Sequence, residues 1–298
     1  MESLYRTLTA AKIEAVRDLS LAAHSSFRIG GDARLACFPR SREELLACLR
    51  LAREGGVTPI VIGNASNVVF PDEGLDGLVI FTGKCRQLRV DGETLHADAG
   101  ATLASLAIAA RDAALSGLAF AAGIPGTLGG AVLMNAGAYG GCMADICVVS
   151  DFYDAESNTV GSFSGEEQAF ANRTSVYAQN PRYTVLGATL VLQRGVRAEI
   201  EAQMRELAAR RRASQPLELP SAGSVFKRPE GHFAGKLIED CGLKGMRVGD
   251  AEVSQKHAGF IVNRGGATAA DVRALVELIR ERVLHDTGVE LECEIRFL

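Results

Sequence analysis

The sequence predicts an α+β protein with more than one domain, and three observations support this class. The chain has 298 residues, which exceeds the size at which one hydrophobic core keeps growing. Segments of helical periodicity with capping residues alternate with short apolar runs that are typical of strands. Apolar residues make up 47% of the chain and charged residues 23%, close to the average of a globular protein.

The first predicted unit covers residues 1–83 and has a βαββ-like order. Residues 1–20 predict a short amphipathic helix, and their charges are spread without the apolar core of a secretory signal. Ser41 and Glu44 form a capping box ahead of a helix that Gly55 ends. Apolar strands are expected at 57–63, 68–70 and 77–81.

The second predicted unit covers residues 84–196. Asp91–Gly92 lies between two alternating runs and predicts a tight hairpin. Thr102 is expected to begin a helix of small residues that ends at Ser116. Residues 113–144 carry no charged side chain, but their glycines exclude a membrane-spanning helix. Further strands, typical of an antiparallel sheet, are expected within 147–163 and 183–193.

The third predicted unit covers residues 197–298 and opens with a helix that Pro216 ends. A second helix begins at the Thr268 cap and stops at Gly288. Residues 289–297 alternate between apolar and charged side chains, a pattern of a strand with one buried face. The expected core positions are Val272, Leu275, Val276, Ile279 and Val283 of that helix, and Val289, Leu291, Cys293, Ile295 and Phe297 of the strand.

Charge and cysteine content exclude several classes of protein. The formal net charge is −4, whereas a nucleic-acid binder needs a basic face that displaces counterions from phosphates. Seven cysteines stand at irregular spacings that predict neither a disulfide framework nor a metal site, so we expect reduced thiols and a cytoplasmic protein. His257 has no second histidine or cysteine at metal spacing, and we expect a structural role for it.

Two glycine-rich stretches can bind an anion. "GNASN" at 63–67 lies between two apolar strands, so its backbone amides can point outward together. "GIPGTLGGAVLMNAGAYGG" at 123–141 leaves few side chains in the way of a ligand, and a short helix starting near Gly130 would offer its positive end to a phosphate. Neither stretch matches the dinucleotide fingerprint or the P-loop pattern. Together they indicate a bulky phosphate-bearing ligand, with tight backbone packing as the alternative.

Three polar residues have both a chemical and a structural interpretation. Ser224 in "SAGSVFKRP" is either a turn residue beside Gly223 or the edge of an active site. Arg173 can pair with a carboxylate through its guanidinium fork or lie on the surface. Glu294 has the solvated face of an edge strand as its local interpretation. The local sequence leaves these alternatives open.

Separate motifs along almost the whole chain resemble, in order, one family: the flavoprotein UDP-N-acetylenolpyruvoylglucosamine reductases of bacterial cell-wall synthesis. The compact third unit, which has no inserted loop, resembles the shorter of the family's two forms. The motifs are "SFRIGGDA", "GNASN", "AGIPGTLGGAVLMNAGAYGG", "NRTSVY", "RRRASQPLELPSAGSVFKRP", "AGKLIEDCGLKGMRVGDAEVSQKHAGFIVN" and "LECEIR".

The resemblance implies a two-part FAD-binding fold of the vanillyl-alcohol-oxidase (PCMH) type over residues 1–83 and 84–196. An α+β substrate-binding domain would follow at 197–298, with a catalytic glutamate on its terminal strand. The glycine-rich stretches would then hold the FAD pyrophosphate, and neighbouring residues would flank the flavin. The implied cofactor-binding residues are Arg28, Ile29, Gly30, Gly31, Gly63, Asn64, Ala65, Ser66, Asn67, Gly123, Ile124, Pro125, Gly126, Thr127, Gly129, Gly130, Asn135, Gly137 and Ala138.

The family's activity implies NADPH-dependent, FAD-mediated reduction of UDP-N-acetylglucosamine enolpyruvate to UDP-N-acetylmuramate in peptidoglycan precursor synthesis. Arg173, Ser224 and Glu294 match the family's catalytic set. The implied partners are the sugar nucleotide and NADPH, with no nucleic acid, no membrane and no metal, and we expect a monomer. The implied substrate-binding residues are Lys227, Arg228 and Gln215.

This sequence departs from the family at two positions. Ala65 stands where a second glycine usually precedes Ser66, so the backbone there must take a conformation that alanine can adopt. Asn172 replaces a tyrosine that commonly precedes the arginine, which removes an aromatic neighbour from the substrate side. Two other classes stay open: a flavin oxidase of the same fold, which would need no NADPH, and a catalytically silent nucleotide-binding protein.

Overall fold

Two of the helices begin at capping residues that the sequence predicts. A computed structural model describes all 298 residues. Ser41 accepts a hydrogen bond from the Glu44 amide at the start of α2 (Arg42–Glu54), as predicted. Thr268 and its partner three residues later form the predicted capping box of α8 (Ala269–Thr287), and Gly288 ends that helix with a left-handed φ of 73°. The other helices are α1 (Glu2–Ala10), α3 (Leu103–Asp112), α4 (Leu128–Leu133), α5 (Val176–Gln179), α6 (Arg197–Ser214) and α7 (Ala234–Asp240), with short 3-10 helices at Ala22–His24, Thr82–Lys84, Ala119–Ala121, Met143–Asp145 and Gly165–Gln168.

The chain divides into two compact units. Unit 1 consists of Met1–Arg17, Leu35–Asn64 and Gly77–Arg210, and unit 2 consists of Asp18–Arg34, Ala65–Asp76 and Arg211–Leu298. Several elements therefore begin in one unit and end in the other. The division into three parts that the sequence predicts stays a prediction.

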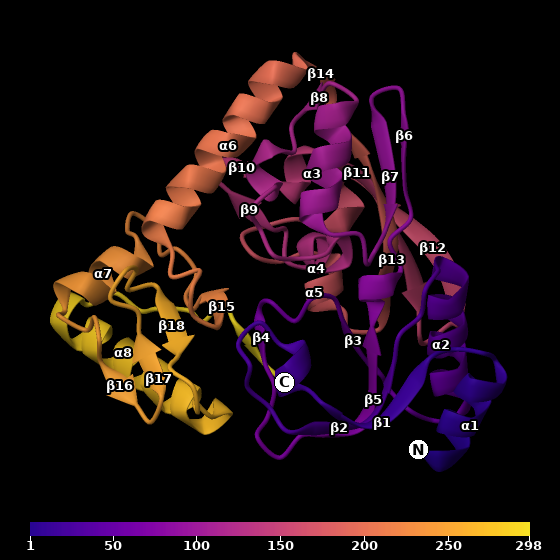
Figure 1. The fold of residues 1–298 in the computed structure, drawn as a ribbon, viewed down its shortest axis with the longest axis horizontal. Coiled ribbons are helices and arrows are strands. Elements are labelled where there is room, and N and C mark those ends of the chain that lie inside the picture. Colours follow the sequence, from indigo (N-terminus) through magenta and orange to yellow (C-terminus); the bar gives the residue numbers. More distant parts are fainter. The chain divides into compact units, whose positions relative to one another are not determined.

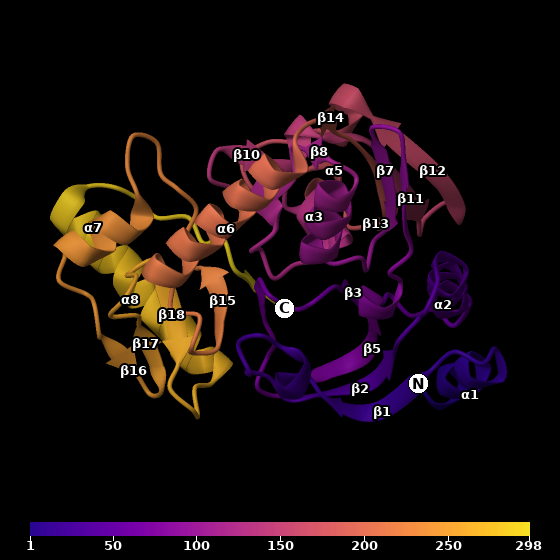
Figure 2. The same ribbon diagram turned by 45° about the horizontal axis from the view of Figure 1, so that its top comes forward.

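A five-stranded antiparallel sheet forms the centre of unit 1, with helices on both of its faces (Figure 1). Helix α3 packs on one face because Leu103, Leu106, Ala107 and Ala110 recur at helical spacing and are all buried. The opposite face of the sheet shares a core with α1 and α2 (Figure 2). The strands, in sheet order, are β12 (Thr159–Ser164), β11 (Cys147–Asp154), β13 (Tyr183–Val191), β7 (Thr94–Asp98) and β6 (Leu88–Asp91).

A second sheet has four strands, in which β3 (Ile60–Ile62) pairs in parallel with β5 (Leu75–Phe81). Three of its strands contain residues of both units. Two-stranded ribbons add β8 (Leu115–Ser116) with β14 (Gln193–Arg194), and β9 (Gly137–Ala138) with β10 (Gly141–Cys142). The strands of the second sheet, in order, are β1 (Ala15–Ser20), β2 (Asp32–Cys37), β5 (Leu75–Phe81) and β3 (Ile60–Ile62).

Unit 2 contains a small sheet that packs against α7 and α8. The apolar stripe predicted for α8 is confirmed, since all five of its residues are buried. The terminal strand β19 (Arg296–Phe297) pairs in parallel with β4 (Val68–Val69). The small sheet has the order β15 (Ser221–Ser224), β18 (Phe260–Asn263), β17 (Ala251–Val253) and β16 (Arg247–Val248).

Three local predictions differ from the structure. The N-terminal stretch is helical only to Ala10, and its second half joins a sheet as β1, where strand pairing outweighs local propensity. The helix expected to reach Ser116 ends at Asp112 because Ala114 takes a left-handed φ of 56°. The predicted terminal strand is regular only at its end, although Leu291 and Ile295 are buried as the alternation predicts. No helix combines the length and apolar character that crossing a membrane requires.

Candidate active site

A glycine and a buried hydroxyl meet in unit 1. A Cβ atom added to Gly63 would collide with the side chain of Thr127, so only glycine fits there. Thr127 is 1% exposed, and its hydroxyl has no hydrogen-bond partner within the protein. Buried polar atoms almost always have a partner, so this hydroxyl is available to a bound ligand or a water. Asn64 closes the same corner, because its Nδ2 donates to the Pro125 carbonyl over 3.2 Å.

The first amides of α4 are already used by the protein. Leu128 N donates to Ala101 O, and Gly129 N donates to Ala99 O, each over 2.8 Å. The sequence suggested that the start of this helix binds a phosphate. These two amides are instead already bonded within the protein. The group that the corner offers to a ligand is the Thr127 hydroxyl.

The second half of "GNASN" belongs to unit 2. Ala65 is buried and takes a left-handed φ of 47°, the conformation that favours the glycine usual at this position. Its carbonyl accepts a hydrogen bond from Ser26 Oγ over 3.2 Å. Asn67 Nδ2 donates to Glu294 O over 3.2 Å, and Arg296 N donates to Asn67 O over 3.0 Å. The loop is thus tied to the last segment of the chain.

The "SFRIGG" turn in unit 2 also has left-handed backbone. Arg28 has a φ of 56° and an exposed side chain, whereas Ile29 beside it is 2% exposed. A Cβ atom on Gly30 would meet Phe70, so this glycine permits close packing. Asn263 Nδ2 holds the turn by donating to Phe27 O over 3.1 Å.

Ser224 and Glu294 lie on paired segments of unit 2. Gly223, at a φ of 81°, precedes Ser224, whose side chain is exposed at the end of β15. Glu294 N donates to Val225 O over 2.7 Å, and Phe226 forms a β-bridge with Cys293. The structure therefore brings Ser224 and Glu294, 70 positions apart in the sequence numbering, to one edge of this unit.

The thiol beside Glu294 is not a reactive group. Burial raises the pKa of Cys293 to about 11, so the thiol stays protonated near neutral pH. All seven cysteines are free, and no group of three or more His, Cys, Asp or Glu residues is placed to hold a metal ion. The polar groups available for chemistry at this edge are the hydroxyl and the carboxyl.

Two of the expected substrate-binding residues have protein partners in unit 2. Lys227 Nζ forms an ion pair with Glu292, and its amide donates to Glu292 O over 2.8 Å. Gln215 follows α6 with a half-buried side chain, and its amide donates to Arg211 O over 2.8 Å. Binding a diphosphate through Lys227 would therefore compete with this ion pair.

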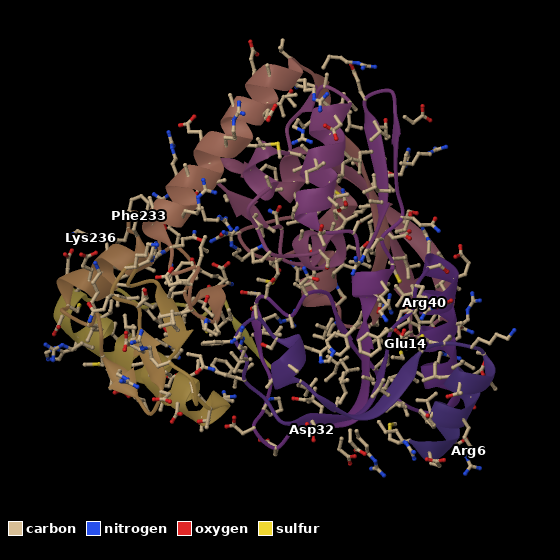
Figure 3. All side chains as sticks on the ribbon, in the orientation of Figure 1. Arg6, Glu14, Asp32, Arg40, Phe233 and Lys236 are labelled. Atoms are coloured by element: carbon tan, nitrogen blue, oxygen red, sulfur yellow. The ribbon has the colours of Figure 1, made fainter.

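The third expected substrate-binding residue, Arg228, stacks on an aromatic ring. Its guanidinium carbon lies 4.0 Å from the centroid of the Phe233 ring. Phe233 is 61% exposed at the N-terminal end of α7, where Lys236 follows three residues later (Figure 3). This pair presents a cation and a flat apolar surface to solvent.

Arg173 lies in unit 1, on a loop before α5. It takes a left-handed φ of 56°, and its Nη2 donates to Gly137 O over 3.2 Å. Asn135, another expected site residue, binds the same loop through Nδ2, which donates to Ala171 O over 3.0 Å. The structure thus brings Arg173 and Asn135 together within unit 1.

Strained backbone gathers at the expected site residues. Of the ten non-glycine residues with positive φ, four belong to the expected set: Arg28, Ala65, Asn135 and Arg173. Such conformations are costly and tend to mark functional positions. Sequence reasoning missed two buried polar residues that hold these segments, Asn263 and Ser175. Both lie within the quoted family motifs, but the sequence assigned them no role because their partners lie far away along the chain.

Comparisons with known proteins point to one family. Residues 33–161 match a family model described as an FAD binding domain, and residues 215–298 match the C-terminal domain of UDP-N-acetylenolpyruvoylglucosamine reductase. The protein of that name from Shouchella clausii is 47% identical over 278 residues, which cover 93% of this chain and 89% of that protein. The one from Caldanaerobacter subterraneus subsp. tengcongensis is 44% identical over 275 residues, with 92% and 90% covered.

Solved structures give the same result for the fold. The crystal structure of the reductase from Thermus caldophilus matches with a TM-score of 0.80 and 36% identity, covering 96% of this chain and 98% of that chain. An alkyldihydroxyacetonephosphate synthase matches with a TM-score of 0.50 and 17% identity over 65% of this chain and 40% of that one, a likeness of fold alone. The predicted fold class, an FAD-binding fold followed by an α+β domain, is confirmed. From sequence identity over nearly its whole length and from its fold, the chain belongs to the UDP-N-acetylenolpyruvoylglucosamine reductase family.

Proposed function

We propose that this protein reduces UDP-N-acetylglucosamine enolpyruvate to UDP-N-acetylmuramate, with NADPH as the source of hydride and FAD as its resident cofactor. Membership of the reductase family supports this class of reaction. The observation that carries the proposal is the pairing of the Ser224 and Glu294 segments in unit 2, through Glu294 N and Val225 O. This pairing supports a site in which the Ser224 hydroxyl and the Glu294 carboxyl come from adjacent segments of the chain.

The corner at Gly63 and Thr127 fits the pyrophosphate of FAD. The buried Thr127 hydroxyl lacks a partner, and a side chain at position 63 would collide with it. When bound, the flavin supplies hydride transfer, a reaction that no amino-acid side chain performs. The proposed FAD-binding residues are those implied by the sequence within 28–31, 63–67, 123–130 and 137–138. Asn135 is left out of this set because both polar ends of its side chain already bind the protein.

The three proposed catalytic residues suit an enolpyruvyl group. Hydride addition to its β-carbon builds negative charge on the α-carbon and the carboxylate. The Arg173 guanidinium can pair with that carboxylate through two parallel hydrogen bonds. A protonated Glu294 would donate a hydrogen bond to the developing charge, and the Ser224 hydroxyl would deliver the proton to the α-carbon.

We further propose that Lys227, Arg228 and Gln215 bind the sugar nucleotide. The exposed guanidinium of Arg228 can pair with a phosphate of the diphosphate. Because this contact is made equally in the ground state and in the transition state, Arg228→Ala should raise KM more than it lowers kcat.

The test is an anaerobic titration of the purified protein, followed through the visible absorbance of its flavin. NADPH should remove that absorbance, and one equivalent of the enolpyruvyl sugar nucleotide should restore it while the lactyl ether product forms. Turnover with oxygen and without NADPH would identify the oxidase class instead. Failure to bind FAD would identify the silent nucleotide-binding class, and either result contradicts the proposal.

A further inference from the structure

The loop that carries Arg173 is closed by its own backbone. Ala171 N donates to Thr174 O over 3.1 Å, and Thr174 N donates to Ala171 O over 3.3 Å. Between these two residues, Arg173 takes its left-handed conformation and donates to Gly137 O. The direction of the guanidinium therefore depends on where this small loop is held.

Asn135 holds the first end of the loop. Its Nδ2 donates to Ala171 O over 3.0 Å, while its Oδ1 accepts from Ala144 N over 2.9 Å. The residue is 7% exposed and takes a left-handed φ of 43°, which asparagine tolerates because its short amide bonds locally. Both ends of the side chain thus bind backbone groups of the protein.

Ser175 holds the other end of the loop. Its side chain is completely buried, and Oγ donates to Leu133 O over 2.8 Å. Leu133 is the last residue of α4, two positions before Asn135. The same short segment after α4 therefore anchors the loop on both sides of Arg173.

We infer that Asn135 and Ser175 are positioning residues, which hold the Arg173 loop so that the guanidinium is ready for the substrate carboxylate. The sequence motif suggested that Asn135 flanks the flavin, whereas in the structure its Nδ2 bonds the arginine loop and its Oδ1 is held by Ala144 N. Groups held in advance lose little freedom when the substrate binds, and small displacements of such groups slow a reaction strongly. This inference rests on the role proposed above for Arg173.

The experiment compares Asn135→Ala, Ser175→Ala and Arg173→Ala. It also includes two double variants, in which Asn135→Ala or Ser175→Ala is combined with Arg173→Ala. Three quantities are measured: the FAD dissociation constant of the apoprotein, the rate at which NADPH removes the flavin absorbance, and the rate at which substrate restores it. Asn135→Ala should lower the rate at which substrate restores the absorbance about 10- to 100-fold, and Ser175→Ala should lower it about 10-fold. A 1 Å displacement of the Arg173 guanidinium has effects of this order. FAD affinity and the NADPH step should stay unchanged.

Combination with Arg173→Ala gives the sharpest result. If the two residues act through the arginine, then their substitution should have almost no further effect once Arg173 is alanine. Effects that multiply, or a loss of FAD affinity in Asn135→Ala, would overturn the inference. An Arg173→Ala variant with a normal substrate step would instead overturn the proposed role of the arginine.

Asn180→Ala is the matched control. Asn180 Nδ2 donates to Val176 O over 2.9 Å, so this variant also removes one bond from an asparagine to a carbonyl near α5. It should leave the substrate step unchanged, and an equal loss in this control would overturn the inference. If Asn135→Ala does not fold in a thermal melt, Ser175→Ala carries the test by itself.

Discussion

The candidate site residues are held in different ways in the two units. In unit 1, side chains bind backbone carbonyls: Asn64 binds Pro125, Asn135 binds Ala171, and Arg173 binds Gly137. In unit 2, the Ser224 and Glu294 segments are held mainly by backbone-to-backbone bonds. A substitution in unit 1 therefore changes both chemistry and position, whereas one at Ser224 or Glu294 changes the chemistry and leaves the frame intact.

Substitution of Glu294 in unit 2 is expected to have a large effect on turnover. Glu294→Ala removes a proposed donor to the developing charge and should lower kcat about 10²- to 10³-fold. Glu294→Gln keeps a donor and should recover part of this loss. Steady-state kinetics measure both, and urea unfolding should show unchanged stability because the backbone bonds of residue 294 remain.

Glu290→Ala is the control, since Glu290 is exposed and lies 3.6 Å from Arg280 as a surface ion pair. Its turnover should be normal. If Glu294→Ala lowered turnover no more than Glu290→Ala did, the strand edge of unit 2 would have no chemical role.

Gly63→Ala tests unit 1, where a substitution should disturb the position of the site residues as well as their chemistry. The added Cβ would collide with Thr127, so stability should fall by about 1–3 kcal/mol, and FAD should bind more weakly. Urea unfolding and a fluorescence titration with FAD measure the two effects. Gly77→Ala is the control, because no atom lies within 4 Å of its added Cβ. Equal stability of the two variants would show that the corner is less tight than described.

Ala65→Gly should stabilise its loop in unit 2. This is a position at which the chain departs from the family. The left-handed conformation of an L-residue costs roughly 1–2 kcal/mol, while glycine loses about 0.5–1 kcal/mol through backbone entropy. The variant should therefore gain up to about 1 kcal/mol in urea unfolding. Ala47→Gly, inside α2, should instead lose about 1 kcal/mol. Destabilisation by Ala65→Gly would mean that the alanine methyl packs well enough to offset the strain.

The smallest effect is a pH dependence of unit 2. Burial lowers the pKa of His257 below its ordinary 6.5, and its Nδ1 accepts a bond from Gly259 N over 3.0 Å. The unfolded chain therefore takes up a proton that the folded chain resists. The contribution to stability is complete above pH 6.5 and declines as the pH falls toward the lowered pKa.

His257→Asn keeps an acceptor for Gly259 and removes the titration. Urea unfolding at pH 7.5 and at pH 5.5, chosen as about one unit on either side of the ordinary pKa, should show a smaller difference for this variant than for the natural protein. An unchanged difference would assign the acid sensitivity to other groups.

Local signals in the sequence predicted the elements that capping and periodicity define. The Ser41 and Thr268 caps, the hairpin at Asp91–Gly92 and the buried stripe of α8 are confirmed. Strand β1 was missed because sheet pairing, which no local pattern records, decides its conformation. Local order is thus predictable where the partners are a few residues apart.

The candidate site shows the same limit. Glycines at positions such as 63 mark close approaches, and the motifs predicted the family that the comparisons then confirmed. The contacts that hold these residues join Asn67 to Glu294, and Asn135 to Ala171, across long separations. A single sequence carries no signal for such pairs, so the positioning roles of Asn135 and Ser175 emerged only from the structure.

The most direct measurement separates the two half-reactions in Ser224→Ala. Under nitrogen, NADPH should remove the flavin absorbance at the natural rate, because the serine has no part in that step. The substrate should then restore it about 10²- to 10⁴-fold more slowly, since the proposed proton donor is missing. Equal slowing of both steps, or of neither, would contradict the assignment of Ser224 as the group that protonates the α-carbon.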